Sequence, residues 1–372
     1  MTAAIYGMGT ALPPHTMTQD EAIELAQEVI CQNKSQARLL DRLYRMAGVS
    51  QRQIAVPFRT ALEWIGKTTS ECPTVAVARP QGATTAERMR LYEQHAPPLA
   101  TTAASRALSA GKVDASEITH LVTVSCTGFS APGVDHALIK SLKLSPKVER
   151  VNVGFMGCHG AINGLRVAKA IVESVPTAKV LLCAVELCSL HYQMVWDPER
   201  MVANALFADG AAAAVLGTAQ SAESEMCSVV ATGSLLLPES AHMMEWFVGE
   251  HGFEMSLSPG VPDLIESRLR PWLEEWLAEK GGLSCDKVNG WAVHPGGPRV
   301  IAAVEKSLGL DAAQTAATRH ILANCGNMSS PTVLFILDRL HQLNGARSSM
   351  VAIAFGPGLT AEVALFRRQQ QC

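Results

Sequence analysis

The segment Pro298-Arg299-Val300, followed by Lys306-Ser307-Leu308-Gly309-Leu310, decides the fold because it has a counterpart earlier in the chain. Pro132-Gly133-Val134 and Lys140-Ser141-Leu142-Lys143-Leu144 precede it by 166 positions at both places (298 − 132 and 306 − 140). In each copy an apolar run comes before the shared segment, and a glycine-containing stretch that opens a helix comes after it. The repeat predicts a duplicated unit whose two similar halves pack face to face.

Short apolar runs predict buried strands, and helical patterns lie between them. The runs are rich in Val, Leu, Ile and Ala without strict alternation, as expected of strands covered on both faces; they are residues 121–125, 179–185, 290–293, 350–355 and 362–366. Residues 161–172 and 331–343 have helical patterns. This alternation predicts a layered α/β fold. We place the boundary near 218–225, which gives expected domains of 1–220 and 221–372.

The composition is that of a folded protein with a large interior. Of 372 residues, 48% are hydrophobic and 17% charged, which argues against disorder. The net charge of −3 makes nucleic acid an unexpected partner. No apolar run reaches the roughly 18 residues of a membrane helix, and no signal peptide is expected. Ten cysteines, many of them in apolar runs, indicate reduced thiols and a cytoplasmic protein.

Three polar residues stand where an α/β enzyme places its chemistry. Cys158 lies between glycines just ahead of a predicted helix, and a helix N-terminus favours the thiolate form of cysteine. His294 follows a predicted strand and precedes Pro295-Gly296-Gly297, a common position for catalytic groups. Asn327 precedes the second helix, and its amide could donate to an oxyanion. Taken singly, each has an ordinary structural explanation: an inert buried thiol, a turn histidine and a capping asparagine.

Together these contexts resemble one family. The stretch around Cys158 and the runs at 294–298, 326–330 and 355–360 are similar to the signatures of chalcone synthase-like type III polyketide synthases. The resemblance extends from the N-terminal Gly7 segment to Leu365. It implies a duplicated thiolase-like fold with five αβαβα layers, which agrees with the repeat, and a homodimer.

The resemblance also implies a mechanism and further site residues. Cys158 would take an acyl group from an acyl-CoA starter, while His294 and Asn327 would support decarboxylation of malonyl-CoA and repeated condensation, ending in a pyrone or resorcinol. No metal or cofactor besides the CoA thioester substrates is implied. The positions that match substrate-binding residues of the family are Phe207 as a gatekeeper, Arg42 and Arg45 at the CoA phosphates, and Gly296 and Gly297.

Departures from the plant pattern concern the substrate pocket. Met255 stands where a second gatekeeper phenylalanine is expected, and Cys126 replaces a threonine lining the cavity. Val49 replaces a third basic CoA contact, and Ala131 replaces a methionine that crosses the dimer interface. The run that ends at His191 resembles bacterial alkylresorcinol and alkylpyrone synthases, which adds His191 to the expected pocket. Smaller or more flexible walls favour a fatty acyl starter.

Two alternatives remain open from the sequence. A β-ketoacyl-carrier-protein synthase III-like enzyme would use the same three residue types for a single condensation. A metal-binding protein could use Cys183, Cys188 and His191, although this spacing lacks the paired Cys-x-x-Cys of common zinc sites.

Overall fold

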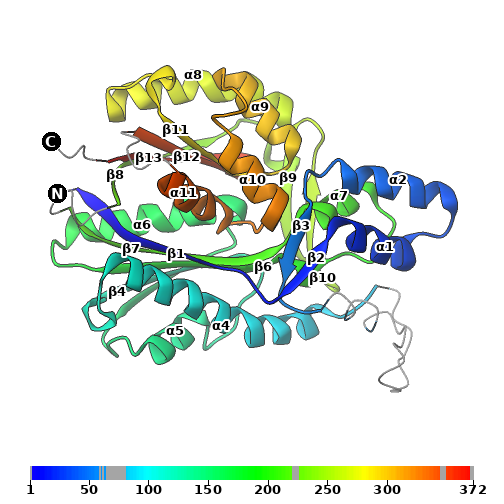
Figure 1. The fold of residues 1–372 in the computed structure, drawn as a ribbon, viewed down its shortest axis with the longest axis horizontal. Coiled ribbons are helices and arrows are strands. Elements are labelled where there is room, and N and C mark those ends of the chain that lie inside the picture. Colours follow the sequence, from blue (N-terminus) through cyan, green and yellow to red (C-terminus); the bar gives the residue numbers. More distant parts are fainter. Residues whose placement is uncertain are drawn as a thin grey trace.

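The computed structural model describes residues 2–57, 60, 63, 81–219, 226–343 and 349–368. A nine-stranded sheet with the order β11-β12-β13-β8-β1-β7-β6-β4-β5 organises this part of the chain (Figure 1). Its strands are β1 (Ala3–Ala11), β4 (His120–Ser125), β5 (Glu149–Gly154), β6 (Val180–Leu187), β7 (Asp209–Thr218), β8 (Cys227–Leu236), β11 (Gly290–Val293), β12 (Ser349–Gly356) and β13 (Thr360–Arg367). The predicted domain boundary falls largely on 220–225, outside the described residues.

The sheet consists of two related halves that meet at the short antiparallel pairing of β1 with β8. On one side of this pairing the order is β1-β7-β6-β4, and on the other it is β8-β13-β12-β11. In each half the outermost pair of this series is parallel, and the next pairs inward are antiparallel. The strands therefore repeat in mirrored sequence, as the duplicated segments predict.

Helices form three layers around the two half-sheets (Figure 1). The middle layer holds α6 (Gly160–Ser174) and α11 (Thr332–Leu343). One outer layer holds α4 (Thr85–Gly111) and α5 (Val134–Leu142), and the other holds α8 (Val261–Gly281) and α9 (Pro298–Leu308). Each outer layer buries its own apolar cluster against its half-sheet. The predicted duplicated fold with five αβαβα layers is confirmed.

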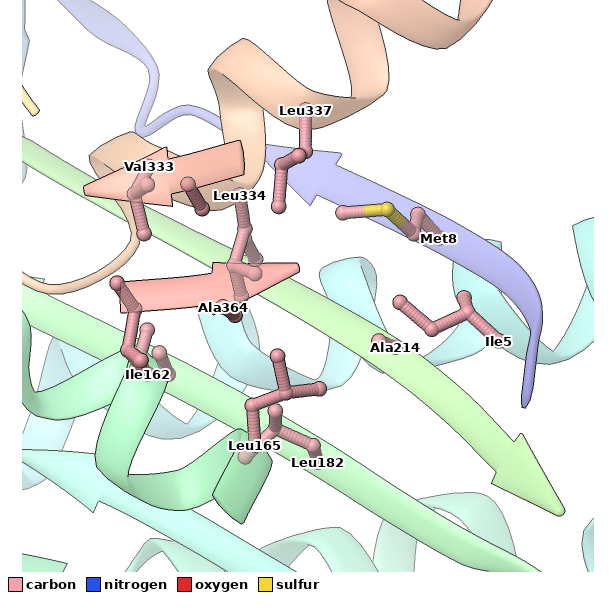
Figure 2. Close-up of a cluster of buried hydrophobic side chains, with 14 of the residues drawn as sticks. Ile5, Met8, Ile162, Leu165, Leu182, Ala214, Val333, Leu334, Leu337 and Ala364 are labelled. Carbon is pink, nitrogen blue, oxygen red and sulfur yellow. The ribbon is translucent and has the colours of Figure 1, made fainter. Parts of the chain in front are cut away.

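The central core joins the two halves. Figure 2 shows Leu165 of α6 beside Leu182 of β6, Leu334 of α11 beside Ala364 of β13, and Leu337 of α11 facing Met8 of β1; Ile162 of α6 belongs to the same cluster. These side chains are at most 6% exposed. Burying a leucine or isoleucine of this kind contributes about 1.5–3 kcal/mol, so the two central helices hold the half-sheets together.

The repeated sequence becomes two helices with matching ends. Before α5 and α9 stand Gly133 and Gly297, and the two helices end at Lys143 and Gly309, which take left-handed conformations with φ of 56° and 70°. Glycine occupies this conformation without a steric cost, whereas lysine does so at a small one. The shared segments at 132–144 and 298–310 are therefore the same capped helix used twice.

Smaller elements gather at one end of the sheet, where they help to enclose the site (Figure 1). They include two antiparallel strand pairs, β2 (His15–Thr18) with β3 (Gln51–Ile54) and β9 (Met244–Gly249) with β10 (Gly252–Leu257). They also include the helices α1 (Gln19–Ile30), α2 (Lys34–Arg45), α7 (Pro198–Leu206) and α10 (Ala316–Cys325). Among the described residues, no helix has both the length and the apolar character needed to cross a membrane.

Candidate active site

One cavity brings together the three polar residues singled out in the sequence. Cys158, His294 and Asn327 all line it. Cys158 comes from the turn before α6, His294 follows β11, and Asn327 lies in the loop between α10 and α11. The cavity is therefore assembled from both halves of the fold, with the thiol supplied by the first half and the imidazole and amide by the second.

Cys158 lies at the beginning of α6, which follows it by two residues. Gly157 has a φ of +70° and packs so closely on Pro357 that a Cβ would not fit. Burial raises the pKa of the Cys158 thiol to about 12, while hydrogen bonding with the Ser329 side chain opposes this rise. Burial thus favours the neutral thiol, and forming the thiolate requires a partner that takes up the proton.

His294 is a buried imidazole that lines the same cavity as Cys158. It is 1% exposed, and neither of its ring nitrogens has a hydrogen-bond partner among the described residues. Burial lowers its pKa to about 3, with a further lowering from His159. An imidazole that is buried, neutral and without a partner can both accept a proton and donate a hydrogen bond to a substrate.

Asn327 presents its amide group to the same cavity. Its Oδ1 accepts a hydrogen bond of 2.8 Å from the Ser329 backbone N–H, which leaves the NH₂ group as a donor. Backbone bonds hold the loop: Asn327 N–H donates to Leu206 O, and Ala208 N–H donates to Asn327 O, both at 2.9 Å. These bonds form a parallel bridge between Phe207 and Asn327, so the backbones that carry the phenyl ring and the amide are fixed to one another.

Phe207 and Met255 lie where three neighbouring cavities meet. Both residues line the cavity with the three polar residues, a second cavity that also contains Cys126, and a third that contains His191. Cys158 lines the first two of these cavities. A side chain at either position therefore lies at the junction of all three cavities, two of which are lined by the Cys158 thiol.

His191 lies in the third cavity, but both of its ring nitrogens are already bonded. Nε2 is 2.6 Å from Thr127 O, and Nδ1 accepts the Phe253 N–H at 2.9 Å. The ring stacks on Phe253 with 4.2 Å between ring centroids and meets Trp246 edge-on. The histidine consequently ties the β9–β10 hairpin, which carries Met255, to the strand end at Thr127.

The residues expected at the CoA-binding end lie apart from these cavities, with one exception. Gly296 lines the first cavity, while Gly297, with a φ of 135°, precedes α9. Arg42 and Arg45 are exposed on α2 and line none of the three cavities. Arg45 is paired with Asp20 and Asp41.

The metal-binding alternative is contradicted by the structure. Cys183 Sγ points to Ala100 O of α4 at 3.7 Å, whereas Cys188 lines the cavities beside Phe207 and the nitrogens of His191 are occupied. In the described ranges, no group of three His, Cys, Asp or Glu residues could hold a metal ion. The side chains of Cys183 and Cys188 point to different places because β6 ends between them. The spacing of the two cysteines in the sequence does not reveal this.

The sequence reasoning missed Glu186, a fully buried carboxyl group behind the second cavity. It accepts hydrogen bonds from Cys126 N at 2.9 Å, Thr127 Oγ1 at 2.6 Å and Ser330 Oγ at 2.5 Å. Burial raises its pKa, and the Ser330 and Thr127 hydrogen bonds oppose the rise. The available signal was an acidic residue inside the apolar run 180–187, since such a residue needs buried polar partners.

Comparisons with known proteins agree with this arrangement. Residues 1–220 match the family described as chalcone and stilbene synthases, N-terminal domain, and residues 228–369 match the corresponding C-terminal domain. The chain is 36% identical to the alpha-pyrone synthesis polyketide synthase-like Pks18 of Mycobacterium tuberculosis, over 98% of this chain and 91% of that protein. It is 34% identical to 1,3,6,8-tetrahydroxynaphthalene synthase of Streptomyces peucetius subsp. caesius, over 98% and 93%.

Solved structures give the same result. PKS-I from the brown alga Ectocarpus siliculosus superposes with a TM-score of 0.90 at 32% identity, covering 99% of this chain and 98% of that one. The type III polyketide synthase domain of Steely1 from Dictyostelium superposes with a TM-score of 0.89 at 25% identity, covering 99% of each chain. With both family domains matched and the fold shared from end to end, the chain belongs to the chalcone and stilbene synthase family and is an acyltransferase of the type III polyketide synthase class.

Proposed function

We propose that this enzyme extends an acyl-CoA starter with malonyl-CoA units on Cys158 and closes the product to a pyrone or resorcinol. The observation that carries the proposal is the shared cavity of Cys158, His294 and Asn327. The relative named for alpha-pyrone synthesis supports the ring type. Residues 1–220 would supply the nucleophile, and residues 221–372 the imidazole and amide.

The first step loads the starter. His294 takes the proton of the Cys158 thiol, and the resulting thiolate attacks the thioester carbonyl of the acyl-CoA. The carbon–sulfur bond to CoA breaks, and the CoA thiolate leaves with the proton from His294. Burial opposes the thiolate and the imidazolium separately, but the two opposite charges stabilise one another when they form together.

The second step uses the hydrogen-bond donors of the other half. Malonyl-CoA loses its carboxylate as carbon dioxide, and the electron pair of the broken carbon–carbon bond becomes an enolate. The Asn327 amide and the His294 ring donate to the enolate oxygen as its charge develops. The enolate carbon attacks the acyl group on Cys158, and the bond to sulfur breaks. The lengthened chain is now a CoA thioester; the Cys158 thiolate attacks its carbonyl, CoA leaves, and the chain is bound to Cys158 for another round.

The walls of the cavities favour a long aliphatic starter. Met255 is flexible and unbranched, and the cavities beside it are lined mainly by apolar side chains, including Met244, Phe207 and Trp246. We therefore propose a fatty acyl-CoA over a coumaroyl-type starter.

A homodimer is the proposed assembly. β5 forms the edge of the sheet, and most of its residues are exposed. Val151, Phe155 and Met156, in or just after this strand, are 37–42% exposed. Exposed strand edges with apolar side chains tend to pair with another chain. Size-exclusion chromatography with light scattering should give twice the chain mass, and a stable monomer would contradict the assembly.

We propose that the reaction runs in the cytoplasm on CoA thioesters alone, without a metal or redox cofactor. The proposal is supported by the chemistry, in which the three cavity side chains accept, donate and hold every proton and charge that forms. Product formation should be unchanged after dialysis against EDTA, and a loss restored by a metal ion would contradict it.

Product analysis tests the proposal as a whole. Purified enzyme would be incubated with malonyl-CoA and matched acyl-CoAs of short-chain, long-chain and aromatic type, and the products identified by mass spectrometry. Pyrones or resorcinols extended several times, formed best from long-chain starters, are expected. Turnover of coumaroyl-type thioesters alone would contradict the proposal of a fatty acyl-CoA starter.

The second candidate is a β-ketoacyl-carrier-protein synthase III-like reaction. It makes one condensation and requires malonyl groups on a carrier protein. The same incubations contain no carrier protein, so a single β-ketoacyl product, or product only after the carrier is added, would establish this alternative.

A further inference from the structure

The residue after the nucleophile, His159, has no part in the proposed reaction, yet it is deeply buried. It ends the single turn Gly157–His159, is 3% exposed and lies one residue before α6. Its ring packs flat on the backbone of Gly356, where no space remains for a Cβ atom. The imidazole is therefore wedged between the turn that carries the thiol and the end of β12 in the second half.

A chain of hydrogen bonds leads away from this ring to an ion pair whose carboxylate is buried. His159 Nδ1 is 2.7 Å from Asn163 Oδ1, and Asn163 Nδ2 donates to Glu362 Oε1 at 3.0 Å. Glu362 lies on β13, is 3% exposed and is paired with Arg166 of α6. The chain thus connects the turn at Cys158, the first helix of the central layer and a strand of the other half.

The order of partners determines the protonation of His159. A carboxylate only accepts hydrogen bonds, so Asn163 must turn its NH₂ group to Glu362 and its oxygen to His159. Nδ1 of His159 is then the protonated nitrogen that donates to this oxygen. An amide oxygen, unlike a carboxylate, does not stabilise an imidazolium by opposite charge, and burial lowers the pKa of His159. The ring is held neutral in one tautomer and one orientation.

We propose that His159 is a positioning residue: through Asn163 and Glu362 it fixes the turn that presents the Cys158 thiol to the cavity shared with His294. The inference rests on the proposed role of Cys158 as nucleophile. A fixed turn matters because a misplacement of about 1 Å at a reacting atom can cost a hundredfold in rate. A neutral ring matters because a charge at His159 would oppose the imidazolium that His294 must form.

Two variants of His159 separate this role from the alternatives. Gln in His159→Gln can still donate to Asn163, whereas Leu in His159→Leu fills similar space without a donor. The measurement is the rate at which iodoacetamide alkylates Cys158 between pH 6 and 9, followed by mass spectrometry of the Cys158 peptide, because Cys126 and Cys188 lie in neighbouring cavities. The alkylation rate does not depend on polyketide formation. The positioning role can therefore be rejected by this measurement whether or not the proposed function is correct.

If His159 positions the turn through its hydrogen bond to Asn163, alkylation should stay within about twofold of the wild-type rate for His159→Gln and be about tenfold slower for His159→Leu. Equal, large losses in both variants would mean that the ring itself transfers protons and would overturn the positioning role. Alkylation rates near that of wild type in both variants would mean that the ring only fills space, and would also contradict the positioning role. Thermal unfolding of each variant shows whether the variant is folded under the conditions of the alkylation assay.

Glu362→Gln tests the same chain of hydrogen bonds at the end farthest from Cys158, without changing a residue of the turn. With no carboxylate to set its direction, the Asn163 amide can rotate and the His159 tautomer is no longer fixed. Alkylation of Cys158 should slow by about threefold or more at each pH from 6 to 9, because the turn that presents the thiol is no longer held in one position. An unchanged rate would overturn the proposal even if His159→Leu fails to fold.

Discussion

The two helices of the central layer occupy equivalent places in the two halves, but the residues in front of them differ. α6 begins two residues after Cys158, so the thiol lies at the helix N-terminus. α11 begins at Thr332, five residues after Asn327, and the loop between them contains Ser329 with a φ of 56°. A non-glycine residue in the left-handed region is strained and is often found at functional sites.

The difference teaches how a duplicated scaffold divides one reaction. In the proposed mechanism the first half provides a nucleophile from the turn at a helix end. The second half provides a donor whose NH₂ group must point into the cavity, and the Ser329 N–H helps to orient it by donating to the amide oxygen. Covalent chemistry and charge stabilisation therefore come from different halves and should be separable by mutation.

Cys158→Ala should break the first half alone and have the largest effect. Condensation should fall by about a thousandfold or more, the scale of losing a covalent nucleophile. Decarboxylation of malonyl-CoA should persist because His294 and Asn327 remain. Both are measured together as extended products and acetyl-CoA by mass spectrometry. Loss of decarboxylation in a variant with an unchanged melting temperature would show that the halves do not act separately.

Asn327→Leu is the reverse test and should have the next largest effect. Removing one donor to a developing oxyanion slows the step it serves by about a hundredfold or more, so malonyl-CoA decarboxylation should fall by this amount. Alkylation of Cys158 by iodoacetamide should stay within about threefold of wild type, because the thiol and His294 are retained. If alkylation falls as far as decarboxylation, Asn327 supports the thiol and the proposed division is wrong.

Much of this site could be predicted because its residues carry local signals. Glycines on both sides of Cys158 and after His294 mark tight turns at element ends, and the repeated segment marks equivalent helices. The strands β1 and β7 were not predicted, since β7 contains Ala211 to Ala214 and β1 is rich in alanine and glycine, which have weak strand propensity. Their identity as strands comes from burial between layers.

Buried polar contacts were beyond the sequence for a different reason. Glu186 binds Cys126 and Ser330, which lie 60 and 144 positions away, and no local pattern predicts such pairs. His191 was expected in the substrate pocket from its place in a family-like run. Its ring does border a cavity, but its hydrogen bonds go to backbone groups of Thr127 and Phe253, which only the packed strands bring within reach.

His191→Gln extends the comparison to stability, with a smaller effect. Burial lowers the pKa of His191 to about 3 from about 6.5 in the unfolded chain. The neutral ring contributes to the stability of the fold above pH 6.5, and this contribution is lost as the pH falls toward 3. The loss in the free energy of unfolding is about 2 kcal/mol at pH 5. Glutamine can donate to Thr127 and accept from Phe253 without titrating.

The melting temperature of the His191→Gln variant should therefore fall less between pH 7 and pH 5 than that of wild type, by a few degrees. His294 is buried and neutral in both proteins, so its own acid sensitivity cancels in the difference. An equal fall in both proteins would mean that the His191 site opens to solvent before the protein unfolds, and the hairpin that carries Met255 would not be fixed by this ring.

Arg42 and Arg45 test whether charge outside the cavities guides substrates to them, and here the smallest effects are expected. Both side chains are exposed on α2, but Arg45 is engaged by Asp20 and Asp41. Exposed charges contribute modestly to binding and are screened by salt. Arg42→Ala should raise the KM for malonyl-CoA about threefold at low salt, whereas Arg45→Ala should have less effect because its charge is already balanced. Equal increases that persist at high salt would indicate direct phosphate contacts by both arginines, and no change in either would place the CoA phosphates elsewhere on the surface.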